Sequence, residues 1–226
     1  MLAAAKRKLR ALGDAKRGKS SRTFFKNCGD DLFLGVPAQQ IRLLAREFEK
    51  LSLLDVRALM HSSVHEERSL AHGILRRKFD AADERGQKSL FSFYLKNRSA
   101  IRDWDGVDDS APYIVGPYLL ERDKKILYHL VRSKNVWDRR IAIVSTWWFI
   151  RNDSTGHTFA LAELLLKDEH DLIHKAAGWM LREAGKRELA SLRRFLKKHG
   201  PRMPRTMLRY AIERFPERER KRYLSL

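Results

Sequence analysis

The fold is decided by Val136–Trp147, VWDRRIAIVSTW, because a related pattern occurs twice more in the chain. The other two copies are VHEERSLAHGIL at Val64–Leu75 and LIHKAAGWMLRE at Leu172–Glu183. Each copy follows a short helical pattern and a turn, and each places a polar or charged pair before an alanine. The equivalent alanines are Ala71, Ala142 and Ala177. Their intervals of 71 and 35 residues fit a repeat of about 35 residues, counted twice and then once.

A repeat of this length predicts pairs of helices. Short first helices are expected at 53–62, 124–133 and 158–168, and a longer second helix follows each of them. The unit missing from the alanine series is centred near residue 107, within IRDWDGVDDSAPYIVG at Ile101–Gly116. No convincing hairpin pattern is present. We therefore predict an all-α protein, an α-solenoid of HEAT-like helix-pair repeats with a concave DNA-binding face.

The charge is strongly positive and concentrated at the two ends of the chain. The 226 residues carry a formal net charge of +19. Residues 1–26 hold nine lysines and arginines with one acid, and residues 186–226 hold fourteen with four acids. This balance favours a polyanion as partner, whereas the alternative is that the charge only keeps the protein soluble. We expect a basic N-terminal segment at 1–20, which either contacts phosphates or is frayed, and a single repeat domain at 21–226.

The composition argues against several other classes of protein. Cys28 is the only cysteine, so neither an internal disulfide nor a cysteine-based metal site is expected. The N-terminus lacks the apolar centre of a secretion signal, and no apolar run is long enough for a membrane span, which predicts a cytoplasmic protein. His170 and His174 are four residues apart without an evident third ligand, and no phosphate-binding glycine-rich loop is present. We expect no metal and no cofactor, and interpret SVHEERS at 63–69 as a solvated helix start.

Trp104 and Asp108 stand four residues apart in the central stretch, so they share one face if that segment is helical. Equivalent positions of successive repeats line one wall of a solenoid, which would bring Arg140 and Trp179 close to them. Asp108 is expected near a helix N-terminus, with Pro112 in the first turns, where the helix dipole favours an ionised carboxylate. The alternative is that Asp108 is only a helix N-cap and that the tryptophans pack in the core.

Four segments, in the order of the repeats, resemble one protein family. FFKNCGDDLFLGVPAQQIRLLAREF at 24–48 is similar to its N-terminal entry segment, and WDGVDDSAP at 104–112 to its acidic motif. NVWDRRIAI at 135–143 is similar to its arginine-bearing helix, and KAAGWMLRE at 175–183 to its tryptophan-bearing helix. From about Phe24 to the C-terminal helices, the chain thus resembles the AlkD-type DNA alkylation repair glycosylases, which are built from HEAT-like repeats.

The resemblance implies an active site of Trp104, Asp108, Arg140 and Trp179. It also implies excision of cationic alkylated purines, such as N3-methyladenine and N7-methylguanine, from duplex DNA without flipping the base into a pocket. In these roles Asp108 stabilises positive charge on the deoxyribose, the two indoles contact sugars and the cationic lesion, and Arg140 holds a phosphate. Phe24 matches a position that is a tyrosine in some members of the family, so a hydroxyl contact is lost here.

Neighbouring residues compete for the same roles. Asp105 and Asp109 are the competing acids, and we expect both to face solvent or to cap the helix. Arg139 competes with Arg140, whose alternative role is an ion pair with Asp138 or with an acid of another repeat.

A second group of residues is expected to contact DNA around the active site: Phe24, Arg139, Lys175 and Arg182. Lys175 and Arg182 are chosen because they flank Trp179 by four and three residues. We therefore predict a monomeric, cofactor-free glycosylase whose partner is duplex DNA containing alkylated purines. The alternative is a non-catalytic HEAT-like module that binds nucleic-acid structure, or a scaffold for protein partners. A binding module would need the basic ends but not Asp108.

Overall fold

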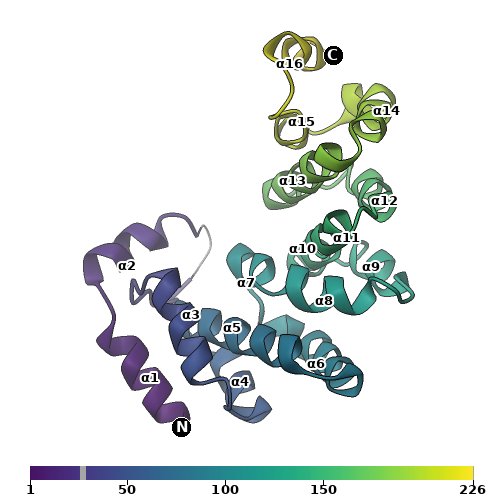
Figure 1. The fold of residues 1–226 in the computed structure, drawn as a ribbon. Helices are drawn as coiled ribbons and strands as arrows, with labels where there is room; N and C mark the ends of the chain where they lie inside the picture. Colours follow the sequence, from purple (N-terminus) through teal and green to yellow (C-terminus); the bar gives the residue numbers. More distant parts are fainter. Residues whose placement is uncertain (26–28, 226) are drawn as a thin grey trace. The chain divides into compact units, whose positions relative to one another are not determined.

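The computed structural model describes residues 1–25 and 29–225, which form α-helices joined by turns (Figure 1). Cys28 lies outside the described residues. No β-strand forms in the described part of the chain, where an isolated β-bridge joins Leu32 to Val64. By its internal contacts the chain divides into two compact units, Met1–Ser110 and Ala111–Leu226.

The first unit is built around one long central helix. Its helices are α1 (Leu2–Ala11), α2 (Ala15–Arg22), α3 (Ala38–Glu47), α4 (Leu53–Met60), α5 (His65–Ala81), α6 (Glu84–Asn97), η1 (Arg98–Ala100) and α7 (Trp104–Asp108). Helix α5 packs against α1, α3, α4, α6 and α7, and its Leu70 and Ile74 are fully buried. Helix α1 buries Ala5 and Leu9, so the basic segment at 1–20 is helical and packed at its start.

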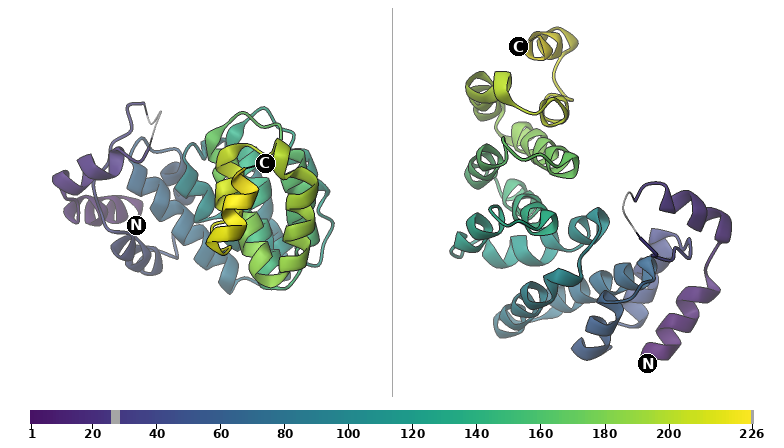
Figure 2. Two further views of the ribbon diagram at one scale, coloured as in Figure 1. Left: turned by 90° about the horizontal axis from the view of Figure 1, so that it is seen from above. Right: turned by 180° about the vertical axis from the view of Figure 1, so that it is seen from behind.

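The second unit is also centred on a long helix. Its helices are α8 (Ala111–Leu119), α9 (Lys125–Leu130), α10 (Val136–Val144), α11 (Thr146–Arg151), α12 (Gly156–Leu164), α13 (Asp171–Arg187), α14 (Leu189–His199), η2 (Gly200–Arg202), α15 (Arg205–Ala211) and α16 (Glu217–Leu224). Helix α13 packs against α10, α11, α12, α14 and α15, and Figure 2 shows α14 and α15 beside it. Its inward side is apolar, with Ile173, Met180 and Leu181 fully buried.

The predicted helix pairs are present in both units. The expected first helices correspond to α4, α9 and α12, and the second helices to α5, α10 and α13. All three alanines that define the repeat are fully buried, which explains why a small residue recurs there: Ala71, Ala142 and Ala177. The all-α class with helix-pair repeats is therefore confirmed, while the concave DNA-binding face stays a prediction.

The repeat expected near residue 107 has an unusual second helix. After α6 and the short η1, the chain forms two short helices, α7 and α8, in place of one long helix. The Asp103 carboxylate caps α7 by accepting the Gly106 N–H at 3.1 Å, and the helix ends after one and a half turns. Pro112 then lies in the first turn of α8, as predicted, where its missing N–H removes no helical hydrogen bond.

The segment 29–37 crosses the start of α5. The Leu32 N–H donates to the Ser63 carbonyl at 3.0 Å, and the His65 N–H donates to the Leu32 carbonyl at 2.9 Å. Gly35 has φ of +76°, and a Cβ there would lie 2.4 Å from the Gly18 nitrogen. Only glycine therefore lets this segment pass α2 so closely, and the crossing covers the first turn of α5.

Candidate functional site

Trp104 and Asp108 are the first and last residues of α7, so their spacing places them on one side of this short helix. Both side chains are half-buried. The N-cap alternative for Asp108 concerned the helix that holds Pro112, which is α8, whereas Asp108 is the last residue of α7, whose N-cap is Asp103. Asp108 instead ends α7 and precedes the start of α8 by three residues, and the expected position near a helix N-terminus holds only with respect to α8.

Trp104 is held by an aromatic cluster from three separate segments. Its indole stacks on Phe25, with ring centroids 5.3 Å apart and an interplanar angle of 11°. The indole N–H donates to the Phe24 carbonyl at 3.4 Å, while the Phe24 side chain is 70% exposed. The His65 ring lies 4.6 Å from Phe25 and stacks on Phe33 at 4.7 Å. The face of Trp104 that could meet a ligand is thus set by aromatic packing.

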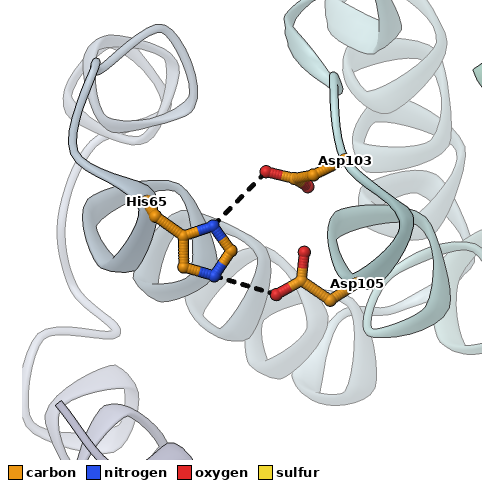
Figure 3. Close-up of side chains that lie close together, drawn as sticks. All are labelled: His65, Asp103 and Asp105. Carbon is orange, nitrogen blue, oxygen red and sulfur yellow. Dashed lines mark ion pairs between the residues drawn. The ribbon is translucent and has the colours of Figure 1, made fainter. Parts of the chain in front are cut away.

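His65 lies between two carboxylates at the base of this cluster (Figure 3). Its Nε2 is 3.0 Å from an Asp105 oxygen, and its Nδ1 is 3.5 Å from an Asp103 oxygen. Arg68 donates to the same Asp103 oxygen at 2.8 Å and to Asp31 at 2.7 Å. These charges are largely withdrawn from water, so each depends on the opposite charges beside it.

The network shifts the ionisation of its members. Burial lowers the pKa of His65, but the hydrogen bonds and charges of Asp103 and Asp105 outweigh burial and raise it to about 10. Burial also raises the pKa of Asp105 to about 6, with Asp103 adding to the rise and His65 opposing it. Against burial, His65 and Arg68 hold the pKa of Asp103 well below its usual range. At neutral pH His65 is therefore an imidazolium and Asp103 a carboxylate.

One ligand atom each from His65, Asp103 and Asp105 lies within 4.8 Å of the others, a spacing that also suits a metal ion. The chemistry of the group differs from that of a metal centre, however. A metal ligand needs a neutral imidazole nitrogen, whereas both nitrogens here face carboxylates that favour the protonated ring. Arg68 also places a positive charge on Asp103. The arrangement is that of an ion-pair network.

The interpretation of SVHEERS as a solvated helix start is wrong. His65, Glu66, Glu67 and Arg68 are all buried, because the segment 29–37 covers this end of α5 and because α1 places Lys6 and Arg10 against Glu67. Glu66, for example, accepts the backbone N–H groups of that segment at 2.9 and 2.6 Å. The available signal was the run of four ionisable residues at the start of a helix whose later positions are apolar. Such a run can be buried only if partners come from elsewhere in the chain.

The acids beside Asp108 have different surroundings. The expectation that Asp105 faces solvent is wrong, because its side chain is only 20% exposed and lies against His65, but it does accept the Gly106 N–H in the first turn of α7 at 2.9 Å. Asp109 is exposed and is the C-terminal cap residue of α7, in agreement with the prediction. Although the residue is exposed, the surrounding protein partly desolvates its carboxyl group, and this desolvation and the negative charge of Asp108 raise the pKa of Asp109. Arg76 and Arg42 oppose that rise, which places their positive charges near it.

In the second unit, Arg140 and Trp179 lie on the packed helices α10 and α13. Arg140 is 5% exposed and donates to the Leu172 carbonyl in the first turn of α13 at 2.6 Å. Trp179, two turns later on α13, is half-buried. The rival residue Arg139 pairs with Asp168 at 2.6 Å. Arg139 thus makes an ion pair with an acid of another repeat, and the ion pair considered as the alternative role of Arg140 stays a prediction.

Lys175 and Arg182 flank Trp179 on α13, as their spacing requires. Lys175 pairs with Asp171 at 2.8 Å and its side chain is 42% exposed. Arg182 is less accessible, at 18% exposed, and pairs with Glu213. Lys175 is therefore the more accessible of the two cations.

The predicted four-residue site consists of two pairs. Trp104 and Asp108 are positioned within the first unit, and Arg140 and Trp179 within the second. The structure thus gives each pair its local geometry, and the meeting of the two pairs stays a prediction.

Comparison with known proteins identifies the family. A family model described as DNA alkylation repair enzyme matches residues 5–215. The chain belongs to this family. A solved chain described as "Predicted DNA alkylation repair enzyme from Enterococcus faecalis" has the same fold, with a TM-score of 0.73 and 15% sequence identity, and the match covers 91% of this chain and 98% of that chain. None of the curated proteins matches the sequence.

The match confirms the resemblance that the four motifs suggested and the HEAT-like repeat fold. It also assigns the alkylation repair protein to a family named for an enzyme that acts on DNA. Among the residues that the structure describes, no helix is both long and apolar enough to cross a bilayer.

Proposed function

We propose that this alkylation repair protein is a monofunctional DNA glycosylase. Its substrates are N3- and N7-alkylated purines in duplex DNA, and it works as a cytoplasmic monomer without a cofactor. The family match over residues 5–215 carries the proposal. Further support comes from Trp104 and Asp108, which share one side of α7 and are both partly accessible.

The proposed chemistry needs only one carboxylate. An alkylated purine that carries a positive charge leaves as a neutral base, so no general acid has to protonate it. Positive charge develops on the deoxyribose as the glycosidic bond lengthens, and the Asp108 carboxylate stabilises that charge and orients the attacking water. Glycosidases that act on neutral sugars commonly need a second carboxyl group for the leaving oxygen. This route also requires no pocket for a flipped base.

The two tryptophans supply selectivity for a charged lesion. An indole face attracts a cation by about 0.5–2 kcal/mol, and it also offers an apolar surface to deoxyribose. Trp104 suits this role because Phe25 fixes its ring orientation. Trp179 is proposed to contact the same lesion with its own indole face.

Arg140 is proposed to hold a phosphate beside the lesion. Its guanidinium is anchored on the Leu172 carbonyl, and a planar fork of five N–H donors can serve two acceptors at once. We propose further DNA contacts for the exposed Phe24 ring and for three cations: Arg139, Lys175 and Arg182. These cations already have carboxylate partners, which phosphates would replace.

Base release is the direct test of this function. Duplex DNA containing N7-methylguanine or N3-methyladenine is incubated with the protein, and free base is measured by chromatography against unmodified duplex. We expect release from both alkylated duplexes and none from the unmodified one. Binding to the alkylated duplexes without release of either base would instead favour the non-catalytic binding module.

A further inference from the structure

His65 contacts the chain on both sides of Trp104. Its Nδ1 lies 3.5 Å from an oxygen of Asp103, the residue before Trp104, and its Nε2 lies 3.0 Å from an oxygen of Asp105, the residue after it (Figure 3). One rigid ring fixes the two nitrogens relative to each other. A single side chain at the start of α5 therefore holds α7 on either side of this tryptophan.

The two carboxylates that His65 contacts also begin α7. In both acids the Oδ1 atom accepts the Gly106 N–H, at 3.1 Å for Asp103 and at 2.9 Å for Asp105. The Oδ2 atom of each acid faces His65. A helix of five residues has too few internal hydrogen bonds to hold its own geometry. The contacts of His65 therefore fix the first turn of α7, and with it the direction of the side chains that α7 carries.

The same imidazole supports the ring on which Trp104 stacks. It lies 4.6 Å from the Phe25 ring, and it stacks on Phe33 at 4.7 Å with an interplanar angle of 18°. Phe25 in turn stacks on the Trp104 indole. His65 thus acts on Trp104 by two routes, the backbone of α7 and the face of Phe25.

The contact with both carboxylates requires a protonated ring. A neutral imidazole turns a lone pair toward one of the two carboxylates, which repels it, whereas an imidazolium presents an N–H to each. Although burial lowers the pKa of His65, the hydrogen bonds and charges of Asp103 and Asp105 raise it to about 10. Arg68 donates to the Asp103 oxygen that faces His65 at 2.8 Å, which keeps that carboxylate ionised. The two-sided contact is therefore complete at neutral pH.

We propose that His65 is a positioning residue for base excision, because it sets the direction in which Trp104 and Asp108 meet the lesion. The residue is 8% exposed, so it acts through α7 and not on the DNA itself. The proposal rests on the proposed function, which assigns Trp104 and Asp108 to the reaction. A purely stabilising role would make the loss of His65 costly to folding but would leave the excision rate of the folded protein unchanged.

The test is single-turnover release of N7-methylguanine from duplex DNA by His65→Gln at saturating protein. The temperature is one at which far-UV circular dichroism shows the variant to be folded. We expect a rate about tenfold or more below that of the unsubstituted protein, because small displacements of reacting groups slow a reaction strongly. DNA affinity should be unchanged, since His65 provides no phosphate contact. A normal excision rate in the folded variant would overturn the proposal.

Leu59→Ala is the matched control for lost stability. Leu59 is fully buried on α4, which packs against α5. The cavity left by this substitution destabilises the same unit without removing either carboxylate contact of His65. We expect the folded control variant to release the base at the normal rate. A rate as low as that of His65→Gln would show that lost stability explains both results, and it would overturn the positioning role.

Asp105→Asn keeps the proposal testable if His65→Gln does not fold. The amide oxygen can still accept the Gly106 N–H, and Asp103 keeps its contacts with His65 and Arg68. The variant therefore loses only the negative charge that faces Nε2 of His65. We expect excision to be slower by about threefold or more, because one of the two contacts that fix α7 is weakened. Excision at the normal rate would contradict positioning through α7.

A spectroscopic measurement separates this proposal from the glycosylase function. The near-UV circular dichroism of Trp104 is the difference between the spectrum of each protein and that of the same protein carrying Trp104→Phe. We expect this signal in Leu59→Ala but not in His65→Gln, because stacking on Phe25 fixes the indole. An unchanged signal in folded His65→Gln would overturn the positioning role even if the protein releases no base. Absence of release from both alkylated duplexes would refute the glycosylase alone.

Discussion

Adjacent acidic residues around α7 are given different tasks by their surroundings. Asp103 caps the helix and pairs with Arg68, whereas Asp105 pairs with His65. Asp109 is exposed at the C-terminal end of α7, and Asp108 ends the helix on the same side as Trp104. Asp103 and Asp105 thus have a structural explanation that does not involve catalysis. Asp108 is the acid that the family motif selects for the reaction.

The ion pairs of His65 predict a loss of stability at alkaline pH. Its pKa in the folded protein is about 10, above its value of 6.5 without the fold. Its contribution to the free energy of unfolding is therefore complete below pH 6.5, declines as the pH rises toward 10 and is lost above that value. The loss is up to about 5 kcal/mol, because the pKa changes from 6.5 to about 10 on folding and each pKa unit is worth about 1.36 kcal/mol.

The measurement is urea unfolding at several pH values for the protein and for His65→Gln. The stability difference between them should shrink as the pH rises from 6.5 toward 10. His61→Gln serves as the matched control, because His61 is exposed at the end of α4. A stability difference that stays constant across this pH range would show that the His65 imidazolium contributes nothing to the free energy of unfolding.

Among the helices, α7 depends most on its surroundings. With five residues it is too short to be stable alone, and it presents Trp104 and Asp108 only because neighbouring segments fix it. Asp103 joins it to Arg68 of α5, and Phe25 stacks on Trp104. The position of the catalytic candidates therefore depends on the buried start of α5.

Removing the central cation of that contact should be costly. In Arg68→Met the side chain keeps its length but leaves Asp31 and Asp103 with less compensation, so we expect a loss of about 3 kcal/mol in the free energy of unfolding. Arg102→Met is the matched control. Arg102 also pairs with Asp31, at 2.9 Å, but is 45% exposed, so its loss should cost about 1 kcal/mol or less. Denaturant unfolding measures the free energy of unfolding of both variants. Equal losses would contradict the claim that the buried ion pairs of Arg68 contribute more to stability than the exposed ion pair of Arg102.

The helix pairs could be predicted from sequence because their signal is local. Ala71, Ala142 and Ala177 recur at a fixed interval, and apolar residues at helical spacing surround them. The environment of α5 could not be predicted, since His65 and Arg68 obtain their partners from segments 35–40 residues away in the chain. Nothing local to SVHEERS indicates that residues 29–37 cover it. A periodic pattern does not indicate which distant segments of the chain will pair with a helix.

At the scale of the whole molecule, the four candidate residues belong to two units. The acidic motif belongs to the first unit, and the arginine and second tryptophan belong to the second. The family match over residues 5–215 spans both. Motif order in the sequence was therefore sufficient to predict the family, whereas the roles of the candidate residues stay predictions. Spacing alone cannot give the distance between the two pairs, because small changes in packing at each repeat accumulate along a helical array.

The most direct test of the central claim is the single-turnover rate of N7-methylguanine release from duplex DNA by the protein and by Asp108→Asn, with DNA affinity measured in parallel. We predict that the variant is slower by about 10²-fold or more while it binds DNA as tightly, because one aligned anion is lost and no phosphate contact is removed. Asp30→Asn, at an exposed site in the same unit, should release the base at the normal rate. Equal rates for the protein and Asp108→Asn would contradict the account.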